Sequence, residues 1–148
     1  MESKESRKLY QFFSRTVNPF FLFTGAGTAL VGLYAIVPSW AMPNVAKLHY
    51  LQEYTIIIQH WGIMVGIMGI CMMLAAMVPE WRVPILLYSA IEKSYMAWLV
   101  LSNAQQPFVN GFWVPFSVDS TVVIYTIGYF LTCGFRSPNS NGRSASSK

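Results

Sequence analysis

Four long apolar stretches constrain this chain more than any other feature of its sequence. They cover residues 17–37, 55–78, 84–101 and 118–135 of a 148-residue chain. A bilayer core about 30 Å thick is crossed by about 20 residues of α-helix, and each stretch meets or approaches that length. Charged residues make up only 11% of the chain, whereas soluble domains carry about 25%. We therefore expect an all-α fold, a four-helix transmembrane bundle that forms one membrane domain, residues 17–135.

The basic residues outside these stretches predict the topology. They precede the first stretch, separate the second from the third, or follow the fourth: Lys4, Arg7, Lys8, Arg15, Arg82, Arg136, Arg143 and Lys148. The two loops on the opposite side contain only Lys47. Because cytoplasmic loops carry the excess of Lys and Arg, we expect an up-down-up-down bundle with both termini in the cytoplasm. The membrane expected is the cell membrane, in particular the bacterial cytoplasmic membrane.

The same topology assigns the two ends of the chain. Residues 1–16 then form a basic cytoplasmic segment before the first span. Residues 136–148 are rich in Ser and Asn, and such a composition cannot bury enough apolar surface to fold, so a disordered cytoplasmic tail is expected.

Composition and motifs argue against several function classes. The net charge of +4 arises from the tails and one short turn rather than from a basic stripe, so no nucleic-acid partner is expected. Cys71 and Cys133 both lie in apolar stretches and form no CxxC motif, which indicates neither a redox motif nor a disulfide framework. The chain has no HExxH, GxSxG or Walker motif, so the sequence indicates no catalytic residue, metal or cofactor. We expect a non-catalytic protein.

The most informative polar feature is the adjacent pair Glu92 and Lys93 in the third stretch. A charge at the centre of a bilayer costs roughly 2.5 to 3.5 kcal/mol on insertion scales, and such residues usually mark a functional site. At the rise of an α-helix, Glu92 lies about 12 Å from Pro84, near the midplane of the membrane. The pair therefore defines the first candidate site.

Antiparallel pairing of neighbouring stretches places other polar residues at the height of this pair. The predicted ligand site consists of Glu92, Lys93, Thr28, Tyr88, Tyr95, Tyr125 and Thr126, with Thr24 and Ser89 at the same height. Tyr88 and Tyr95 share a helix face with Glu92. Lys93 points about 100° away from Glu92, because successive residues of a helix are rotated by that angle.

Three interpretations of this site are open. The two charges could neutralise each other and fix helix packing, the site could hold a small apolar or amphipathic molecule such as a lipid or quinone, or it could dock a partner subunit or a second copy of the chain.

A second polar layer is predicted near the outer surface. By the same pairing, His60 lies level with Ser102 and Asn103, and Asp119 begins the fourth stretch at a similar height. A contact between His60 and Asp119 is therefore geometrically allowed. The alternative is that each side chain is solvated separately at the membrane interface.

Small residues recur at helical spacing in the first two stretches. Gly62, Gly66 and Gly69 follow one another along the second stretch, and Gly25 and Ala29 form a similar pair in the first. Such spacing lets two helix backbones approach closely in a membrane. We interpret these residues as internal packing positions rather than as a dimer face.

Several short motifs resemble a known family. They are the His-Trp-Gly at 60–62, the glycine-rich run GIMVGIMG, the turn PEWRVP and the Glu-Lys pair of the third stretch. Together with the four-stretch layout, they resemble the DoxX-like group of small bacterial membrane proteins. This resemblance implies a compact four-helix bundle in a cytoplasmic membrane. Because some members of that group are linked to sulfur oxidation with quinone, it also implies a membrane redox component as a further possible function.

Overall fold

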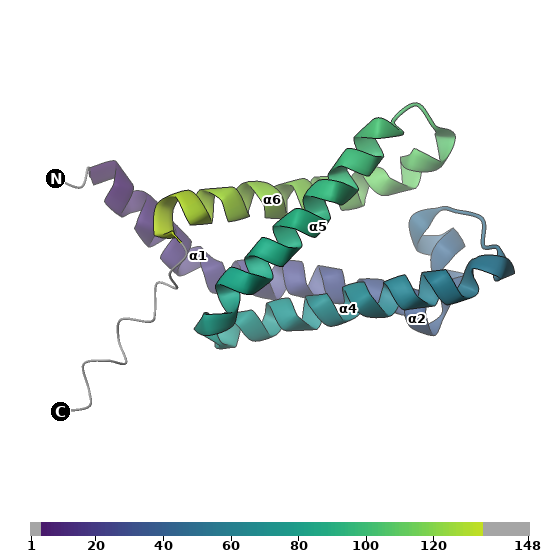
Figure 1. The fold of residues 1–148 in the computed structure, drawn as a ribbon, viewed down its shortest axis with the longest axis horizontal. Helices are drawn as coiled ribbons and strands as arrows, with labels where there is room; N and C mark the ends of the chain where they lie inside the picture. Colours follow the sequence, from purple (N-terminus) through teal and green to yellow (C-terminus); the bar gives the residue numbers. More distant parts are fainter. Residues whose placement is uncertain (1–3, 135–148) are drawn as a thin grey trace.

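The computed structural model describes residues 4–134, and this part of the chain is all-α. Its four long helices are α1 (Lys4–Ala29), α4 (Thr55–Met77), α5 (Arg82–Ser102) and α6 (Trp113–Cys133). Each long helix runs opposite to the one before it, so the start of α1 and the end of α6 lie at the same end of the molecule (Figure 1). The tail predicted for residues 136–148 lies outside the described residues.

Shorter helical segments connect the long helices. A 3₁₀ turn (Leu30–Gly32) and α2 (Leu33–Ile36) continue α1; then follow α3 (Pro38–Ala41), a π-helical turn (Met42–Ala46) and three further 3₁₀ turns (Gln52–Tyr54, Pro79–Trp81, Pro107–Phe112). The prolines explain several of these boundaries, because proline lacks the backbone N–H and fits best in the first turn of a helix, although Pro19 lies inside α1. Pro38 accordingly begins α3, and Pro79 begins the turn between α4 and α5.

The helices match the predicted stretches closely in the middle of the chain and less well at its ends. The second stretch, 55–78, corresponds to α4 at Thr55–Met77, and the third, 84–101, lies within α5. The first stretch was expected to begin at residue 17, but α1 already begins at Lys4. The fourth was expected to begin at residue 118, but α6 begins at Trp113, which puts Pro115 in its first turn.

Three segments of the described chain are long and apolar enough to cross a membrane: Lys4–Ile36, Gln52–Met77 and Pro107–Cys133. The α5 helix is 21 residues long, which is also sufficient for a span, but Arg82, Glu92 and Lys93 lower its mean hydropathy. Large apolar side chains are exposed along all four long helices, Phe23, Ile56, Ile91 and Ile124 among them. A surface of this kind is suited to lipid and not to water. The chain is therefore a candidate multi-pass membrane protein with three candidate spans.

Glycines join α1 and its continuation to α4 in one closely packed pair. A Cβ atom added to Gly66 would lie 2.9 Å from the Cα of Gly32, and one added to Gly25 would lie 2.8 Å from the carbonyl oxygen of Gly69. Distances below about 3 Å leave no room for a side chain, so the two backbones touch. Gly62 packs against Tyr34 in the same way, since a Cβ atom added to Gly62 would lie 2.9 Å from the Cβ of Tyr34. The close packing predicted from the glycine spacing is confirmed.

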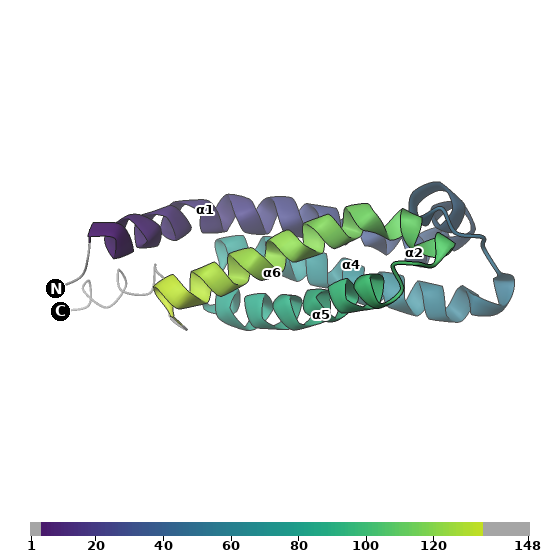
Figure 2. The ribbon, with the colours of Figure 1, turned by 90° about the horizontal axis from the view of Figure 1, so that it is seen from above.

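The other half of the molecule is the pair α5 and α6. Helix α5 starts beside the end of α4 and then crosses away from it toward α6, as the two perpendicular views show (Figures 1 and 2). At the end where α1 begins, the two halves share a hydrophobic core, in which Phe21, Met72, Leu86 and Tyr129 are fully buried. The expected bundle thus consists of two tightly packed helix pairs that join over this core.

Candidate functional site

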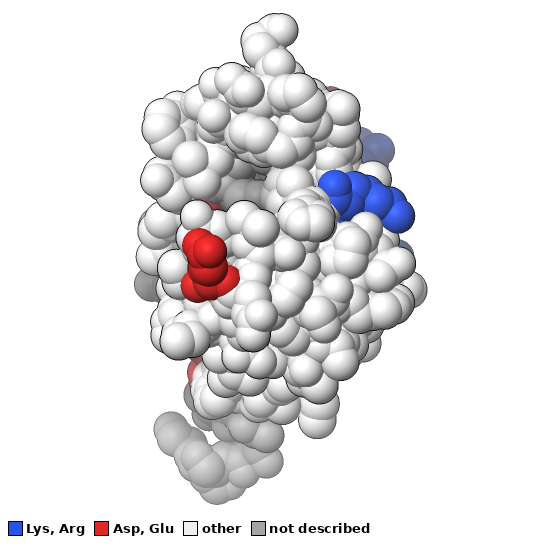
Figure 3. Space-filling view, turned by 90° about the vertical axis from the view of Figure 1, so that its right-hand side faces the viewer, with Lys and Arg blue, Asp and Glu red and all other residues white. Residues whose placement is uncertain are grey.

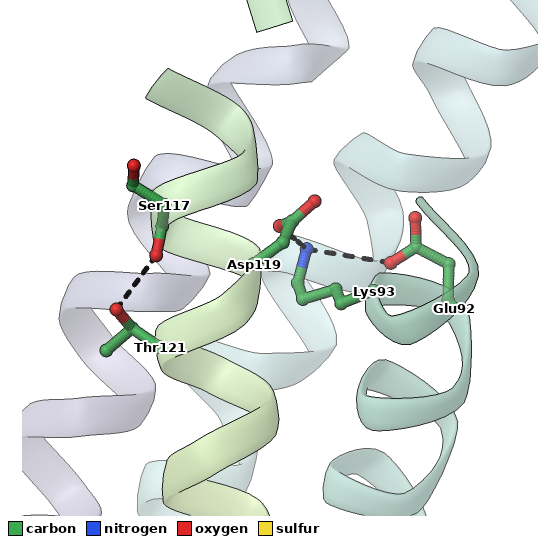
Figure 4. A network of polar contacts seen from close by, with 5 residues as sticks. All are labelled: Glu92, Lys93, Ser117, Asp119 and Thr121. Carbon is green, nitrogen blue, oxygen red and sulfur yellow. Dashed lines mark hydrogen bonds and ion pairs between the residues drawn. The ribbon is translucent and has the colours of Figure 1, made fainter. Parts of the chain in front are cut away.

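Lys93 is the centre of a three-residue polar cluster between α5 and α6. Its Nζ atom donates a hydrogen bond to Oδ1 of Asp119 at 2.8 Å and lies 3.5 Å from Oε2 of Glu92 (Figure 4). The side chains of Lys93 and Asp119 are only 6% and 12% exposed, whereas that of Glu92 is 35% exposed. Lys93 therefore links α5 to α6 through a buried ion pair with Asp119, and Glu92 lies beside Lys93 at the partly exposed edge of the cluster.

The helical repeat explains why these three residues meet. The buried residues of α5 include Arg82, Leu86, Ser89 and Lys93, and those of α6 are Asp119, Val122, Thr126 and Tyr129. Both sets recur at spacings of three and four residues, which is one face of each helix. Lys93 and Asp119 belong to these facing stripes, so their side chains point toward each other. Glu92 is one residue away from the stripe and therefore points partly outward.

The cluster holds one ammonium and two carboxylates, so its formal charge is −1 with all three groups ionised. A buried ion pair is favourable only when its geometry is good and its remaining hydrogen-bonding capacity is used. The short Lys93–Asp119 bond meets the first condition, since charge-assisted N–H···O bonds are about 2.7 to 2.9 Å long. The excess negative charge resides on the exposed member, Glu92, and this is the group that a further molecule could contact.

The contact that the sequence allowed between His60 and Asp119 is not among the hydrogen bonds and ion pairs of the described side chains. His60 lies exposed on α4, while Asp119 is buried and pairs with Lys93. The cause is the early start of α6 at Trp113, which lowers Asp119 from the expected helix end to the height of Lys93. Asp119 therefore belongs to the same cluster as Glu92 and Lys93.

The other residues of the predicted ligand site are distributed over three places. Tyr88 and Tyr95 are exposed on the outer side of α5, one turn on either side of Glu92. Tyr125 faces α1, where its ring stacks on Phe20 at 3.7 Å and its hydroxyl lies 3.0 Å from Oγ1 of Thr16. Thr28 is buried on α1 and Thr126 on α6. Among the described side chains, Lys93 forms its hydrogen bond and ion pairs with Asp119 and Glu92 and not with these residues.

A second polar cluster surrounds Arg82, which the sequence placed only as a basic residue of the cytoplasmic turn. Its side chain is 1% exposed and donates hydrogen bonds to the carbonyl oxygens of Ala75 and Ala76, at 3.2 and 3.3 Å, and to Oδ1 of Asn18 at 2.7 Å. The two carbonyls belong to the last turn of α4, whose acceptors have no partner within the helix. Arg82 therefore caps α4 and links it to α1. Only the three-dimensional fold reveals this role.

Three hydroxyl groups lie unpaired along the interface of α5 and α6. The side-chain oxygens of Ser89, Thr126 and Tyr129 are fully buried and have no hydrogen-bond partner among residues 4–134. A buried polar group without a partner costs about 1 to 3 kcal/mol. Ser89 and Thr126 were predicted at the height of Glu92 and Lys93, whereas no feature of the sequence singled out Tyr129.

The described residues contain no group of three His, Cys, Asp or Glu side chains that could hold a metal ion. Comparison with known proteins adds no assignment: no protein-family model, no curated protein and no solved structure matches this chain. The resemblance to the DoxX-like group therefore rests on the short motifs alone.

Proposed function

We propose that this chain is a four-span membrane protein with both termini in the cytoplasm, and that α5 is its fourth span. The end of the molecule where α1 begins carries the exposed basic residues Lys4, Arg7, Lys8 and Arg15. At the opposite end most of the surface is neither acidic nor basic (Figure 3). This asymmetry supports a cytoplasmic location of the basic end and an orientation in the bacterial cytoplasmic membrane.

The function that the geometry supports best is the non-catalytic binding of a small amphipathic molecule at Glu92. The carrying observation is that Glu92 is the one partly exposed member of a cluster in which two carboxyl groups share one ammonium. A carboxylate that faces hydrocarbon is costly, and Glu92 shares its cation, Lys93 at 3.5 Å, with Asp119. A bound head group that donates hydrogen bonds to Glu92 would remove this cost, and Tyr88 and Tyr95 flank the same surface with exposed rings.

The chemistry of the cluster narrows the ligand class. An ionised carboxylate only accepts hydrogen bonds, and the Lys93 ammonium is already engaged by Asp119 and Glu92. The polar head should therefore carry hydroxyl or ammonium groups, as in the hydroquinone form of a membrane quinone or a lipid alcohol. An anionic head would be repelled.

The test is extraction of the full chain after purification in a mild detergent, with identification of small molecules by mass spectrometry. Glu92→Gln removes the charge at the site, and Glu80→Gln is the matched control on the exposed turn between α4 and α5. We expect a hydroxyl- or ammonium-bearing amphiphile near one per chain in the native protein and in Glu80→Gln, and at least ten-fold less in Glu92→Gln. Equal retention in both variants would refute the site.

One observation favours a second candidate, an accessory subunit of a larger membrane complex. Beside Glu92, the outer face of α5 presents the exposed side chains of Ile91, Tyr95 and Trp98, and the rings of Tyr95 and Trp98 stack at 5.6 Å. A partner helix could cover this face and satisfy Glu92 in place of a ligand. Native mass spectrometry of the same preparation separates the two: a stoichiometric protein partner, lost in Glu92→Gln, would favour the subunit, and a bound small molecule would favour the ligand site.

A further inference from the structure

A cavity lies at the basic end of the molecule, where the start of α1 meets the end of α6. It has a volume of about 310 Å³, and its walls are Ser6, Arg7, Leu9, Tyr10, Leu131 and Thr132. Every lining residue except Thr132 is exposed, so the cavity opens to the surface. Binding pockets for small molecules span roughly 300 to 1,000 Å³, so this cavity suits a head group rather than a whole lipid.

The lining combines one positive charge, hydroxyl donors and apolar rims. Arg7 supplies a guanidinium, whose planar fork of N–H donors matches the oxygens of a phosphate. The hydroxyls of Tyr10 and Thr132 can donate further hydrogen bonds. Leu9 and Leu131 are 52% and 84% exposed beside them, as expected for side chains that contact acyl chains.

The surrounding charge favours an anion. Lys4 and Lys8 are exposed on the same helix as Arg7, and Glu5 is the only acidic residue in the described part of α1. Basic residues at a membrane surface attract anionic lipids, by about 1 kcal/mol per residue, which corresponds to about five-fold in affinity. Ser6 and Arg7 also lie close to the chain end that the proposed topology puts at the cytoplasmic leaflet.

We propose that this cavity binds the phosphate of an anionic phospholipid of the cytoplasmic leaflet. Arg7 pairs with the phosphate, the hydroxyls of Tyr10 and Thr132 hydrogen-bond to its oxygens, and the acyl chains descend past Leu9 and Leu131. The proposal rests on membrane insertion with the basic end at the cytoplasmic surface, and it is independent of any ligand at Glu92.

The experiment is native mass spectrometry of the full chain titrated with phosphatidylglycerol or phosphatidylcholine in detergent. The variant Arg7→Gln removes the charge in the cavity, and Arg15→Gln removes an equal charge from an exposed position of α1 that does not line the cavity. We expect phosphatidylglycerol to bind more tightly than phosphatidylcholine. Arg7→Gln should weaken phosphatidylglycerol binding about five-fold, with little change in Arg15→Gln.

Three results would overturn the proposal. Equal binding of the two lipids would show that no anion site exists, and equal losses in Arg7→Gln and Arg15→Gln would show a general surface attraction. Displacement of phosphatidylglycerol by millimolar inorganic phosphate would show a site for free phosphate instead of a lipid. Membrane integration is measured separately by carbonate extraction, so a failed topology is distinguished from a failed lipid site.

Discussion

Removing one charge of the Lys93–Asp119 pair should destabilise the protein more than removing both. Lys93→Met leaves the carboxylate of Asp119, which is 12% exposed, without its cation. An uncompensated buried charge of this kind costs about 3 to 5 kcal/mol. Asp119→Asn should cost less, about 1.5 to 3 kcal/mol, the range for a hydrogen bond to a charged group. The lysine then keeps Glu92 as a partner at 3.5 Å.

The double variant Lys93→Met/Asp119→Leu removes the ion pair altogether and leaves apolar side chains between α5 and α6. Replacement of a buried ion pair by apolar residues is often neutral or even stabilising. We therefore expect this variant to lose less stability than Lys93→Met alone. The free energy of unfolding is measured by titration with SDS in mixed micelles, with helix content followed by circular dichroism.

Lys47→Met is the matched control, because it makes the same substitution at an exposed lysine of the loop before α4. Its free energy of unfolding should change by no more than about 0.5 kcal/mol. The reasoning fails if the losses of the two single variants add up to the loss of the double variant. Additive losses would mean that the two charges are not coupled, and the buried pair would not be what joins α5 to α6.

Three further predictions follow from the packing and topology. Gly69→Ala should lower the free energy of unfolding by about 1 to 3 kcal/mol, because the added methyl group overpacks the contact with α1. Gly27→Ala, whose Cβ would meet nothing within 4 Å, should leave the free energy of unfolding unchanged or raise it by about 0.5 kcal/mol. The same SDS titration measures both variants. Arg82→Lys keeps the charge but cannot reproduce the forked hydrogen bonds, and it should cost about 1 to 3 kcal/mol in thermal unfolding. In a cysteine-free background, a maleimide that cannot cross membranes should label Asn110→Cys from outside intact cells and Ser3→Cys only after lysis; the opposite pattern would invert the topology.

The positions of the long helices could be predicted because apolar length is a local property of the sequence. The second stretch is apolar on every side, and Pro79 follows it directly, so its expected range and the observed helix Thr55–Met77 nearly coincide. The glycine spacing was equally informative, since Gly62, Gly66 and Gly69 lie on one face of the helix, where the absence of a side chain lets another helix approach closely. Both inferences depend only on residues within one helix.

The site could be predicted only in part, because it depends on the register between helices. Glu92 and Lys93 were found as charges within an apolar stretch, but their partner Asp119 was not. Apolarity does not mark where α6 begins, since its first turn is aromatic and contains Pro115. The loop is therefore shorter than expected, and Asp119, rather than Tyr125 or Thr126, comes to lie opposite Lys93. An error of a few residues in one loop changes every pairing across two helices.

The two halves of the molecule are held by different forces, and the candidate site lies in the polar half. Helices α1 and α4 pack backbone against backbone at their glycines, whereas α5 and α6 meet through Lys93 and Asp119. At the basic end, polar bonds join the halves, from Arg82 to Asn18 at 2.7 Å. At the opposite end, Gly111 packs against the carbonyl of Ala46.

The Arg82–Asn18 contact and the Gly111–Ala46 contact both lie away from Glu92, which is near the middle of α5. A molecule bound at Glu92 would therefore contact the α5 surface without displacing the contacts that hold the fold together. Variants at Glu92 should accordingly change binding more than stability, whereas variants at Lys93 should change both. Comparing the Glu92 and Lys93 variants therefore separates a binding role of the cluster from a purely structural one. If the role were purely structural, variants at either residue would lower the free energy of unfolding.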